Sequence, residues 1–465
     1  MKVAFVASEV APFSKTGGLA DVAGALPGAL DALGVEVATV TPLYRCVRRH
    51  RPEPTPHRVR VPLGDGAVEA RVFRSGGVFF LEHDPFFDRD GLYGTPNGDY
   101  ADNAARFIFL ARGALELLKL LGAPDVVHAH DWQAGLVPLY LKTLYAGDFP
   151  QTRSVLTIHN LAYQGLFPPS EFPKTGLDWR HYTWKEAEFY GQVNFLKTGL
   201  VHADALTTVS PTYAREIQTP ELGCGLDGVL RERSGALHGI LNGADYAEWD
   251  PSRDPHLPAR YSAEDLSGKA RCKAALQKRF GLPARPGTPV AGMVTRLSEQ
   301  KGIDLLLEAA EALAAEDLQI ALLGSGDRSY QDAVLRMGDR FRHRISVQVA
   351  FDNATAHLVE AGSDLYLMPS RYEPCGLNQI YSLRYGTVPV VRATGGLADT
   401  VIDGVTGFSF GPYTSAAFLQ AVRRALRAYE SPAVWRRMML EGMKQDFSWA
   451  ASARRYRDLY RSLAG

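Results

Sequence analysis

The segment Asp364 to Gln379, DLYLMPSRYEPCGLNQ, brings a carboxylate close to an expected anion site. An apolar run stops at Pro369, passes through a polar loop, and enters a helix-compatible run from Leu377 to Tyr385. In parallel α/β sheets such a loop lies at the carboxyl edge, where the next helix offers free N–H groups to an anion. Glu373 would face this anion, and a neutral, hydroxyl-rich group such as a sugar attached to the anion explains a carboxylate there. Helix capping by Glu373 is the competing interpretation.

Two cations are expected at the same kind of edge. The run VTRLSEQKG places Arg296 at the end of an expected strand and Lys301 just before the next helix. A departing nucleoside diphosphate needs its charge compensated, by a metal ion or by fixed cations. The two side chains therefore predict a diphosphate leaving-group site, with solvated surface positions as the alternative.

A glycine-rich loop near the N-terminus has related chemistry. Residues Lys15 to Gly18, KTGG, put flexible backbone and one cation at a helix start, which suits a diphosphate. It is not a P-loop, because no Gly-Lys-Ser/Thr follows a four-residue spacer. The related run LGSGD at Leu323 to Asp327 lacks the third glycine of the dinucleotide fingerprint, and we expect a tight turn there.

The glycine loop has an internal echo. TGGLAD at Thr16 to Asp21 recurs at Thr394 to Asp399, and each copy is expected to open a helix. The repeat suggests paired Rossmann-like domains, although convergence on a favourable loop would give the same pattern.

The histidines of the run HAHDW could mark a metal site. His128 and His130 alternate along an expected strand and therefore share one face. The further spacing of an HxHxDH hydrolase is absent, so a structural histidine is favoured, with Asp131 entering the ligand site from the end of the strand. His159 and Asn160 follow another strand and belong at the same kind of edge, unless His159 is structural.

Two further groups of residues could serve sugar chemistry. Asp88 to Asp90 matches the DxD pattern that many sugar-nucleotide transferases use to hold a divalent ion, but its Gly-rich setting favours a surface turn. Tyr93, Trp132 and Tyr163 are aromatic residues that could stack on sugar rings, and ordinary packing is the alternative.

Composition bounds the remaining possibilities. The chain has 465 residues, with 51 basic and 51 acidic side chains, so nothing global favours nucleic acid or a membrane surface. Its four cysteines lack CxxC spacing, which indicates a reducing compartment. The N-terminal apolar run is too short for a signal peptide, and no stretch reaches membrane-spanning length. We expect a soluble, cytoplasmic protein of two domains.

Strand-like and helix-like runs alternate along the chain and predict parallel, helix-covered sheets. The expected strands are 3–7, 35–40, 125–129, 154–158 and 205–209, a β-rich patch at 59–63, 68–72 and 78–81, then 290–294, 319–323, 345–350, 365–368 and 388–391. Residues 241–269 contain three prolines and no apolar periodicity, so we expect the inter-domain hinge there. The expected domains are 1–241 and 242–446, with a helix of about 447–465 packing back on the first.

Together, KTGGLADV at Lys15, the edge residues Asp131 and His159-Asn160, RLSEQKG and PSRYEPCGLNQ resemble the bacterial glycogen synthases, close relatives of plant starch synthases. The similarity runs from residue 1 into the C-terminal helix. It implies the GT-B glycosyltransferase fold, with two Rossmann-like domains whose parallel sheets face a deep inter-domain cleft, the first on the acceptor side and the second on the donor side. It also implies glucose transfer from ADP-glucose to the non-reducing end of an α-1,4-glucan such as glycogen or a malto-oligosaccharide, with retention of configuration and without a metal or other cofactor.

The resemblance also implies roles on the donor side. Lys15 and Gly18 would contact the diphosphate or glucose region, and Arg296 and Lys301 would stabilise the leaving phosphate. Glu373 would lie beside the glucose ring. The backbone of three further residues would contact sugar and phosphate: Cys375, Gly376 and Leu377.

The remaining implied roles concern the sugar, the acceptor and the base. His159 and Asp131 would bind or orient glucose, with Asn160 close by, and Glu9 and Tyr93 would lie on the acceptor side. Phe351 falls where the family places an aromatic residue on adenine. The sequence AFD replaces the commoner Gly-Tyr there, so a tyrosine hydroxyl is lost and the base preference stays open.

Three alternatives remain from the sequence. The donor could be UDP-glucose, the chain could be a sugar-nucleotide epimerase with similar paired domains, or it could be a catalytically silent glucan-binding protein. The last is disfavoured because Lys15, Arg296, Lys301 and Glu373 are all present.

Overall fold

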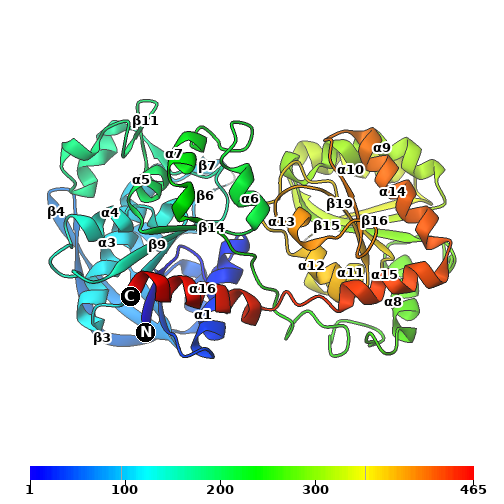
Figure 1. The fold of residues 1–465 in the computed structure, drawn as a ribbon, viewed down its shortest axis with the longest axis horizontal. Coiled ribbons are helices and arrows are strands. Elements are labelled where there is room, and N and C mark those ends of the chain that lie inside the picture. Colours follow the sequence, from blue (N-terminus) through cyan, green and yellow to red (C-terminus); the bar gives the residue numbers. More distant parts are fainter. Residues whose placement is uncertain (96, 351) are drawn as a thin grey trace. The chain divides into compact units, whose positions relative to one another are not determined.

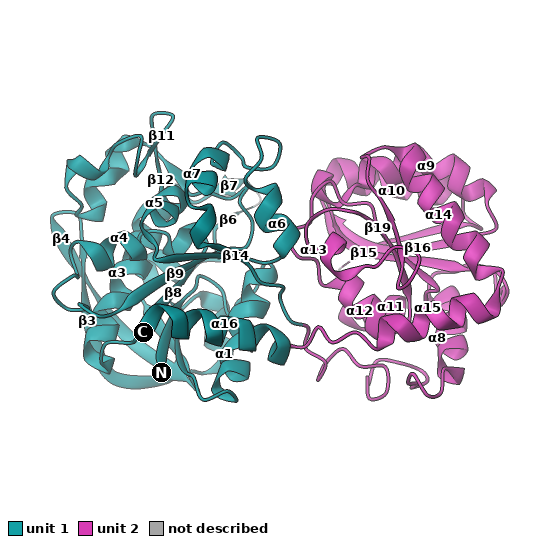
Figure 2. Cartoon of the chain, in the orientation of Figure 1, with its two compact units in different colours: residues 1–243, 449–465 teal, residues 244–448 magenta. Residues whose placement is uncertain are grey.

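The computed structural model describes residues 1–95, 97–350 and 352–465 (Figure 1). These residues form two compact units, which are Met1–Gly243 with Trp449–Gly465 (unit 1) and Ala244–Ser448 (unit 2) (Figure 2). No described helix is both long and apolar enough to cross a membrane.

Unit 1 is built on a nine-stranded sheet of order β14-β13-β9-β8-β1-β2-β5-β4-β3. Its strands are β1 (Lys2–Val6), β2 (Glu36–Pro42), β3 (Glu53–Leu63), β4 (Gly66–Ser75), β5 (Val78–Glu82), β8 (Val126–His130), β9 (Arg153–Ile158), β13 (Ala205–Thr208) and β14 (Leu237–Gly239). All neighbours are parallel except β3–β4 and β4–β5, so the expected β-rich patch forms an antiparallel extension. Among the described residues, five short strands of unit 1 lie outside this sheet. They pair as β6 (Gly94–Thr95) with β7 (Gly98–Asp99), and β12 (Gln192–Asn194) with β10 (Leu166–Phe167) and β11 (Glu188–Phe189).

The central strand β1 pairs with β2 on one side and with β8 on the other. The chain order reverses between β1 and β8, which makes this pair the topological switch point of unit 1. Ligands of open α/β sheets bind beyond the carboxyl ends of strands at such a point. The residues that follow Val6 and His130 are therefore placed at the expected ligand edge.

Helices cover this sheet. They are α1 (Gly18–Asp31), α2 (Asp84–Phe87), α3 (Asn103–Leu121), α4 (Val137–Lys142), α5 (Phe195–His202), α6 (Pro211–Glu216), α7 (Asp227–Glu232) and α16 (Trp449–Ala464). The final helix, α16, packs along α1 (Figure 1). It places Trp449, Ala453, Tyr456 and Tyr460 in one core with residues of β1 and α1.

Unit 2 has a six-stranded, all-parallel sheet of order β17-β16-β15-β18-β19-β20. The strands are β15 (Val290–Leu297), β16 (Gln319–Gly326), β17 (Ile345–Val349), β18 (Leu365–Met368), β19 (Val388–Arg392) and β20 (Phe408–Phe410). In sequence order this is the 3-2-1-4-5-6 arrangement of the doubly wound Rossmann fold, with its switch point between β15 and β18.

Strands of unit 2 send alternate residues to two cores, as a sheet covered on both faces requires. Leu365 and Leu367 of β18 belong to one core, whereas Tyr366 and Met368 belong to the other. The covering helices are α8 (Ser267–Arg279), α9 (Ile303–Ala315), α10 (Arg328–Arg340), α11 (Asn353–Gly362), α12 (Asn378–Arg384), α13 (Gly395–Thr400), α14 (Ser415–Tyr429) and α15 (Pro432–Met443).

One local prediction was wrong. LGSGD was expected to form a tight turn, but β16 continues through Gly326 and pairs with β15 to the end. A Cβ atom on Gly324 would lie 2.1 Å from the Thr295 carbonyl oxygen, and one on Gly326 would lie 2.3 Å from that of Leu297. The glycines therefore allow close approach of two strands rather than a turn.

Candidate active site

A partly buried ion pair lies at the switch point of unit 2. Lys301 Nζ is 2.6 Å from Glu373 Oε2, and Ser370 Oγ donates to the same oxygen at 3.1 Å. Glu373 is only 5% exposed, so its carboxylate is held by a cation and a hydroxyl and not by bulk water. Among the described residues no side chain caps α12, whose N-cap is Leu377, so the capping interpretation of Glu373 finds no support.

Lys301 reaches Glu373 because the segment after β15 lies directly on the loop after β18. Lys301 ends a short 3₁₀ turn, and Gly302 follows with φ +70°. A Cβ atom on Gly302 would lie 2.0 Å from the Pro369 carbonyl oxygen, so only glycine fits this approach. The Arg371 amide also donates to the Gln300 carbonyl at 2.8 Å, which fixes the two loops together.

Arg296 lies near the end of β15 and is exposed. Its guanidinium donates to Gln300 Oε1 at 3.0 Å. It shares the sheet edge with Lys301, as the sequence indicated, but it is directed at the Gln300 side chain and not at Glu373.

The loop from Cys375 to Leu377 presents backbone donors at the start of α12. The amides of Gly376 and Leu377 have no hydrogen-bond acceptor within the described parts of the chain. Gly376 adopts φ +71°, a conformation that favours glycine. Gln379 holds this loop from inside, donating through Nε2 to the carbonyls of Cys375 and Gly376 at 3.0 and 2.9 Å.

The second TGGLAD copy supports this loop from beneath. The Gly396 amide donates to the Glu373 carbonyl at 3.1 Å. A Cβ atom on Gly395 would lie 1.8 Å from the Glu373 carbonyl oxygen, and one on Gly396 would lie 2.0 Å from that of Cys375. This copy is thus a close backbone contact that positions the Glu373 loop.

At the switch point of unit 1, Asp131 follows β8 with a positive φ of 55° and is 9% exposed. Its Oδ1 accepts from the His159 amide at 2.7 Å, which joins the ends of β8 and β9. The side-chain oxygen of Asn160, Oδ1, accepts a hydrogen bond from the Ala162 amide at 3.1 Å. The structure therefore brings Asp131, His159 and Asn160 to one edge.

Burial controls the protonation of these groups. It raises the pKa of Asp131 to about 7, although the His159 and Asn160 amides act in the opposite direction. Burial lowers the pKa of His159 to about 3, so this imidazole is neutral at neutral pH. A carboxyl group that titrates near neutrality beside a neutral imidazole can orient hydroxyl groups by donating as well as accepting hydrogen bonds.

His130 is a partner that the sequence interpretation treated only as structural. Its Nδ1 lies 3.0 Å from His159 Nε2. One of these nitrogens must donate and the other must accept, so each ring fixes the tautomer of the other. His128 stacks on His130 with ring centroids 4.2 Å apart and contacts Tyr460 and Thr157 through its two nitrogens. His128 is therefore a structural histidine, as the sequence favoured. The HAHD motif also contains His130, which the sequence did not identify as the partner of His159.

The first TGGLAD copy is open where the second is packed. A Cβ atom on Gly17 or Gly18 would have no neighbour within 4 Å among the described residues. Lys15 Nζ lies 2.6 Å from Asp21 Oδ1 in an exposed pair, and Asp21 is a contact that the sequence interpretation missed although it belongs to the same motif.

Glu9 and Tyr93 hold this open loop. Glu9 Oε1 accepts from Thr16 Oγ1 at 2.6 Å, its Oε2 accepts from the Gly17 amide at 3.3 Å, and Tyr93 donates to Oε1. Tyr93 also lies 2.7 Å from Ser8 Oγ. Both oxygens of Glu9 are engaged within the loop, so this pair positions KTGG.

The other candidates are placed as follows. Arg45 binds both carboxylates of the DxD motif, Asp88 at 2.8 Å and Asp90 at 2.5 Å, so the motif is an arginine-bound turn. Trp132 is buried, because Gly165 and Phe107 cover its ring, whereas Tyr163 is 54% exposed. The expected adenine-stacking residue, Phe351, lies outside the described residues.

Comparisons with known proteins agree with this arrangement. A family model described as the starch synthase catalytic domain matches residues 2–232, and one described as glycosyl transferases group 1 matches residues 276–438. Glycogen synthase of Anaeromyxobacter dehalogenans (strain 2CP-1 / ATCC BAA-258) is 55% identical, covering 100% of this chain and 99% of that protein. Glycogen synthase of Koribacter versatilis (strain Ellin345) is 50% identical, covering 99% of this chain and 98% of that protein.

Solved structures give the same result. The catalytic domain of starch synthase IV from Arabidopsis thaliana, bound to ADP and acarbose, superposes with a TM-score of 0.91 at 35% identity, covering 100% of this chain and 99% of that one. Sucrose-phosphate synthase from Thermosynechococcus elongatus shares the fold, with a TM-score of 0.62 at 19% identity over 99% of this chain and 98% of that one.

Two Rossmann-like units with charged residues at their switch points, together with these matches, define a glycosyltransferase of the GT-B class. Identity of 50–55% over the full length narrows this class further. The chain belongs to the glycogen synthase family.

Proposed function

We propose that this chain transfers glucose from ADP-glucose to the non-reducing end of an α-1,4-glucan such as glycogen, with retention of configuration and release of ADP. Full-length identity to glycogen synthases supports the reaction. The ADP and acarbose bound to the structurally similar starch synthase support a nucleotide and a glucan as partners. The four cysteines are free, which fits a reducing cytoplasm as the site of the reaction.

In unit 2 the cations are assigned to the leaving group. As the bond to glucose breaks, negative charge grows on the departing phosphate, and fixed cations stabilise it without reorganisation. Lys301 is already positioned against Glu373, and Arg296 lies on the same edge. The Gly376 and Leu377 amides add neutral donors for phosphate or sugar oxygens.

Glu373 is assigned to the sugar. Positive charge develops on the glucose ring while the phosphate departs, and a buried carboxylate beside the ring stabilises it. The acceptor 4-hydroxyl attacks on the face from which ADP leaves, and the departing phosphate oxygen takes the proton. Lys301 and Glu373 thus serve opposite charges of one transition state, and their 2.6 Å contact is the observation that carries the proposal.

Unit 1 is assigned to orientation. Asp131 and His159 bind sugar hydroxyls from the edge at which β8 and β9 end, with Asn160 beside them. Lys15 and Gly18 contact the diphosphate or glucose from the open loop, which Glu9 and Tyr93 hold in place on the acceptor side. Phe351 is assigned to the adenine.

Transfer is proposed to need no divalent metal, because Arg296 and Lys301 supply the charge that a metal would otherwise supply. The donor alternative, UDP-glucose, rests on the loss of a tyrosine hydroxyl at Phe351. The epimerase alternative predicts a product that requires no glucan.

The test is ADP release from ADP-glucose with glycogen present, with and without EDTA, and with UDP-glucose run in parallel. Glucan-dependent, EDTA-resistant release that favours ADP-glucose would support the donor, the reaction and the metal-free site. Release without glucan would indicate hydrolysis and contradict transfer. Glucan-independent change of the sugar would favour the epimerase, and equal release from both donors would remove the ADP preference.

A further inference from the structure

Three potential metal ligands converge in unit 1, in a part of the chain to which the proposed transfer reaction assigns no role. They are His181, Glu186 and His202, and their ligand atoms all lie within 4.8 Å of one another. Each comes from a different segment, namely the 3₁₀ turn Trp179–His181, the loop before β11, and the last turn of α5. The sequence spacing shows no recognisable zinc motif, so only the fold reveals the cluster.

One carboxylate oxygen is the centre of the cluster. Glu186 Oε2 is 2.6 Å from His181 Nδ1 and 3.1 Å from His202 Nε2. In a tetrahedral zinc site, bonds of about 2.0–2.1 Å put neighbouring ligand atoms roughly 3.3 Å apart. The 2.6 Å contact must therefore lengthen by about 0.7 Å, which rotations of the Glu186 and histidine side chains would allow.

The backbone holds the three ligands in position before any ion binds. The Glu186 and Glu188 amides donate to the Thr183 carbonyl at 2.9 and 3.0 Å, which folds the loop back over His181. Lys197 of α5 donates to the Glu188 carbonyl at 2.6 Å and also to that of Trp184. The loop is therefore fastened to the helix that carries His202.

The donor set suits a cation. The three residues offer one carboxylate and two imidazoles, which bind a metal when the carboxylate is ionised and the imidazoles are neutral. His202 is also in the last turn of α5, where the helix dipole favours positive charge.

One hydrogen bond must change when a metal binds. Arg180 Nε donates to His181 Nε2 at 3.4 Å, an arrangement that keeps the proton of His181 on Nδ1. A metal on Nδ1 moves this proton to Nε2, so the exposed Arg180 must turn away. The contact is long and exposed, so its loss costs little.

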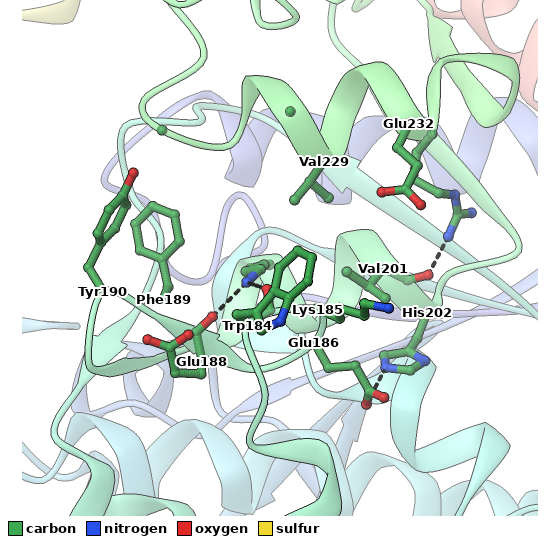
Figure 3. Close-up of a pocket in the computed structure, with 14 residues that line it drawn as sticks. Trp184, Lys185, Glu186, Glu188, Phe189, Tyr190, Val201, His202, Val229 and Glu232 are labelled. Atoms are coloured by element: carbon green, nitrogen blue, oxygen red, sulfur yellow. Dashed lines mark hydrogen bonds and ion pairs between the residues drawn. The ribbon is translucent and has the colours of Figure 1, made fainter.

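The cluster is open to solvent through a cavity of about 780 Å³, which both Glu186 and His202 line (Figure 3). In Figure 3 these two side chains point toward each other, joined by a dashed line, at one end of the cavity. Three cations and three carboxylates line this cavity, so it has no excess positive charge to repel an ion: Lys185, Lys197, Arg233, Glu186, Glu188 and Glu232.

We propose that His181, Glu186 and His202 bind one Zn²⁺ ion, with a water molecule as the fourth ligand facing the cavity. Two imidazoles and one carboxylate form a donor set that suits zinc better than magnesium or calcium. The ion connects the 181–188 loop to the end of α5 and therefore stabilises the fold as a structural zinc site. It takes no part in glucosyl transfer, because the residues assigned to transfer do not line this cavity.

The cluster without an ion is the rival explanation, since Glu186 already connects both histidines by hydrogen bonds. Glu186→Gln separates the two. The amide oxygen of the introduced glutamine still accepts hydrogen bonds from both histidines, so a cluster that holds no metal would keep its contribution to the free energy of unfolding. A zinc site would lose its anionic ligand and bind zinc more weakly.

The experiment is calorimetric titration of chelator-treated, full-length protein with ZnCl₂, together with thermal unfolding. We expect one Zn²⁺ per chain with a dissociation constant of about 1 µM or lower, and a higher Tm with zinc. His181→Gln, Glu186→Gln and His202→Gln should each weaken binding by about 100-fold or more. The matched controls are His238→Gln and Cys224→Ser, which change exposed residues outside the cluster and should leave binding intact.

Absence of stoichiometric binding by the wild-type protein, or binding that survives in all three variants, would overturn the proposal. Cobalt substitution provides a readout that does not depend on any variant folding. Co²⁺ bound to the wild-type protein should show the intense visible absorption of a four-coordinate ion, and a weak octahedral spectrum would contradict the site. Because zinc should raise the Tm without altering ADP release, failure of this inference is distinguishable from failure of the proposed function.

Discussion

The same six residues, TGGLAD, do opposite things in the two units. In unit 1 the glycines face open space, and the contacts of the loop include the surface pair Lys15–Asp21 and the bonds to Glu9. In unit 2 the glycines touch the carbonyls of Glu373 and Cys375 so closely that no side chain fits. Among described residues, then, one copy leaves backbone available to a ligand, and the other uses its backbone to hold a ligand loop.

The two switch points differ in a parallel way. The carboxylate of unit 2, Glu373, is paired with the Lys301 cation. The carboxylate of unit 1, Asp131, is held by backbone amides, and burial raises its pKa to about 7. The two units share the TGGLAD sequence and a switch point in a parallel sheet. In unit 2 this edge carries the Lys301–Glu373 ion pair, whereas in unit 1 it carries Asp131, a carboxyl group that changes charge near neutral pH.

The largest effect should come from alanine at equivalent glycines of the two copies. Gly395→Ala adds a Cβ atom 1.8 Å from the Glu373 carbonyl oxygen at φ +45°, so we expect a loss of about 4 kcal/mol or more in the free energy of unfolding. The matched Gly17→Ala, in open space with extended backbone, should change this free energy by less than about 0.5 kcal/mol. Urea denaturation of both variants is the measurement, and similar losses would remove the contrast.

The second-largest effect is expected when a cation of the unit 2 site is removed. Lys301→Ala removes a side chain that stabilises the leaving phosphate, so kcat should fall by roughly 10²–10³-fold. Arg296→Ala should lower kcat on the same scale. Steady-state ADP release measures both. Arg342→Ala removes an exposed arginine of the same unit and serves as the control. Near-normal kcat in both variants would eliminate the leaving-group role.

Asp131→Asn tests the titrating edge of unit 1. The folded-state pKa of Asp131 is raised to about 7 from an ordinary value near 3.8, so the wild-type carboxyl favours folding below pH 4 and loses that contribution as pH rises to 7. Asparagine does not titrate. The stability of the variant relative to wild type should therefore rise between pH 4 and 7, by on the order of a few kcal/mol, and stay constant above.

Urea unfolding at several pH values gives this difference. A difference that does not vary between pH 4 and 7 would mean that Asp131 is already ionised at low pH. The assignment of a neutral carboxyl at this edge would then be wrong.

The smallest effect is expected for Gly18→Ala. No atom of the described residues lies within 4 Å of the added Cβ, so the free energy of unfolding should change by less than about 1 kcal/mol. The methyl group would obstruct a ligand that approaches the backbone, so the KM for ADP-glucose should rise about tenfold, with Gly28→Ala on the same helix as a control. Unchanged KM would indicate that the open copy does not contact the donor.

The sheets were predictable because buried parallel strands leave long apolar runs, such as Leu365–Met368, that end at polar loops. The position of Lys301 near the Glu373 loop could be anticipated, since both follow strands that end at one edge. Neither the strand order nor the partner of Lys301 is encoded locally. They depend on which strands become neighbours, and only the folded sheet decides that.

Other misses have similar physical causes. Trp132 was a candidate for stacking on sugar, but Gly165, more than thirty residues away in sequence, covers its ring. The hold of Glu9 on the glycine loop through both of its oxygens was also not predictable, because it depends on how the chain folds back after β1. The same limitation applies to the prediction of a turn at LGSGD, which the pairing of β16 with β15 converts into strand.

The last helix has a consequence for synthesis on the ribosome. Tyr456 and Tyr460 complete the core that β1 and α1 begin, and Tyr460 also contacts His128 beneath the strand that leads to Asp131. Unit 2 is one continuous stretch of chain, so all of its residues emerge before those of α16. The part of unit 1 that is translated first therefore stays partly uncovered until α16 has been made. A released chain truncated after residue 448 would contain all of unit 2 beside an incomplete unit 1.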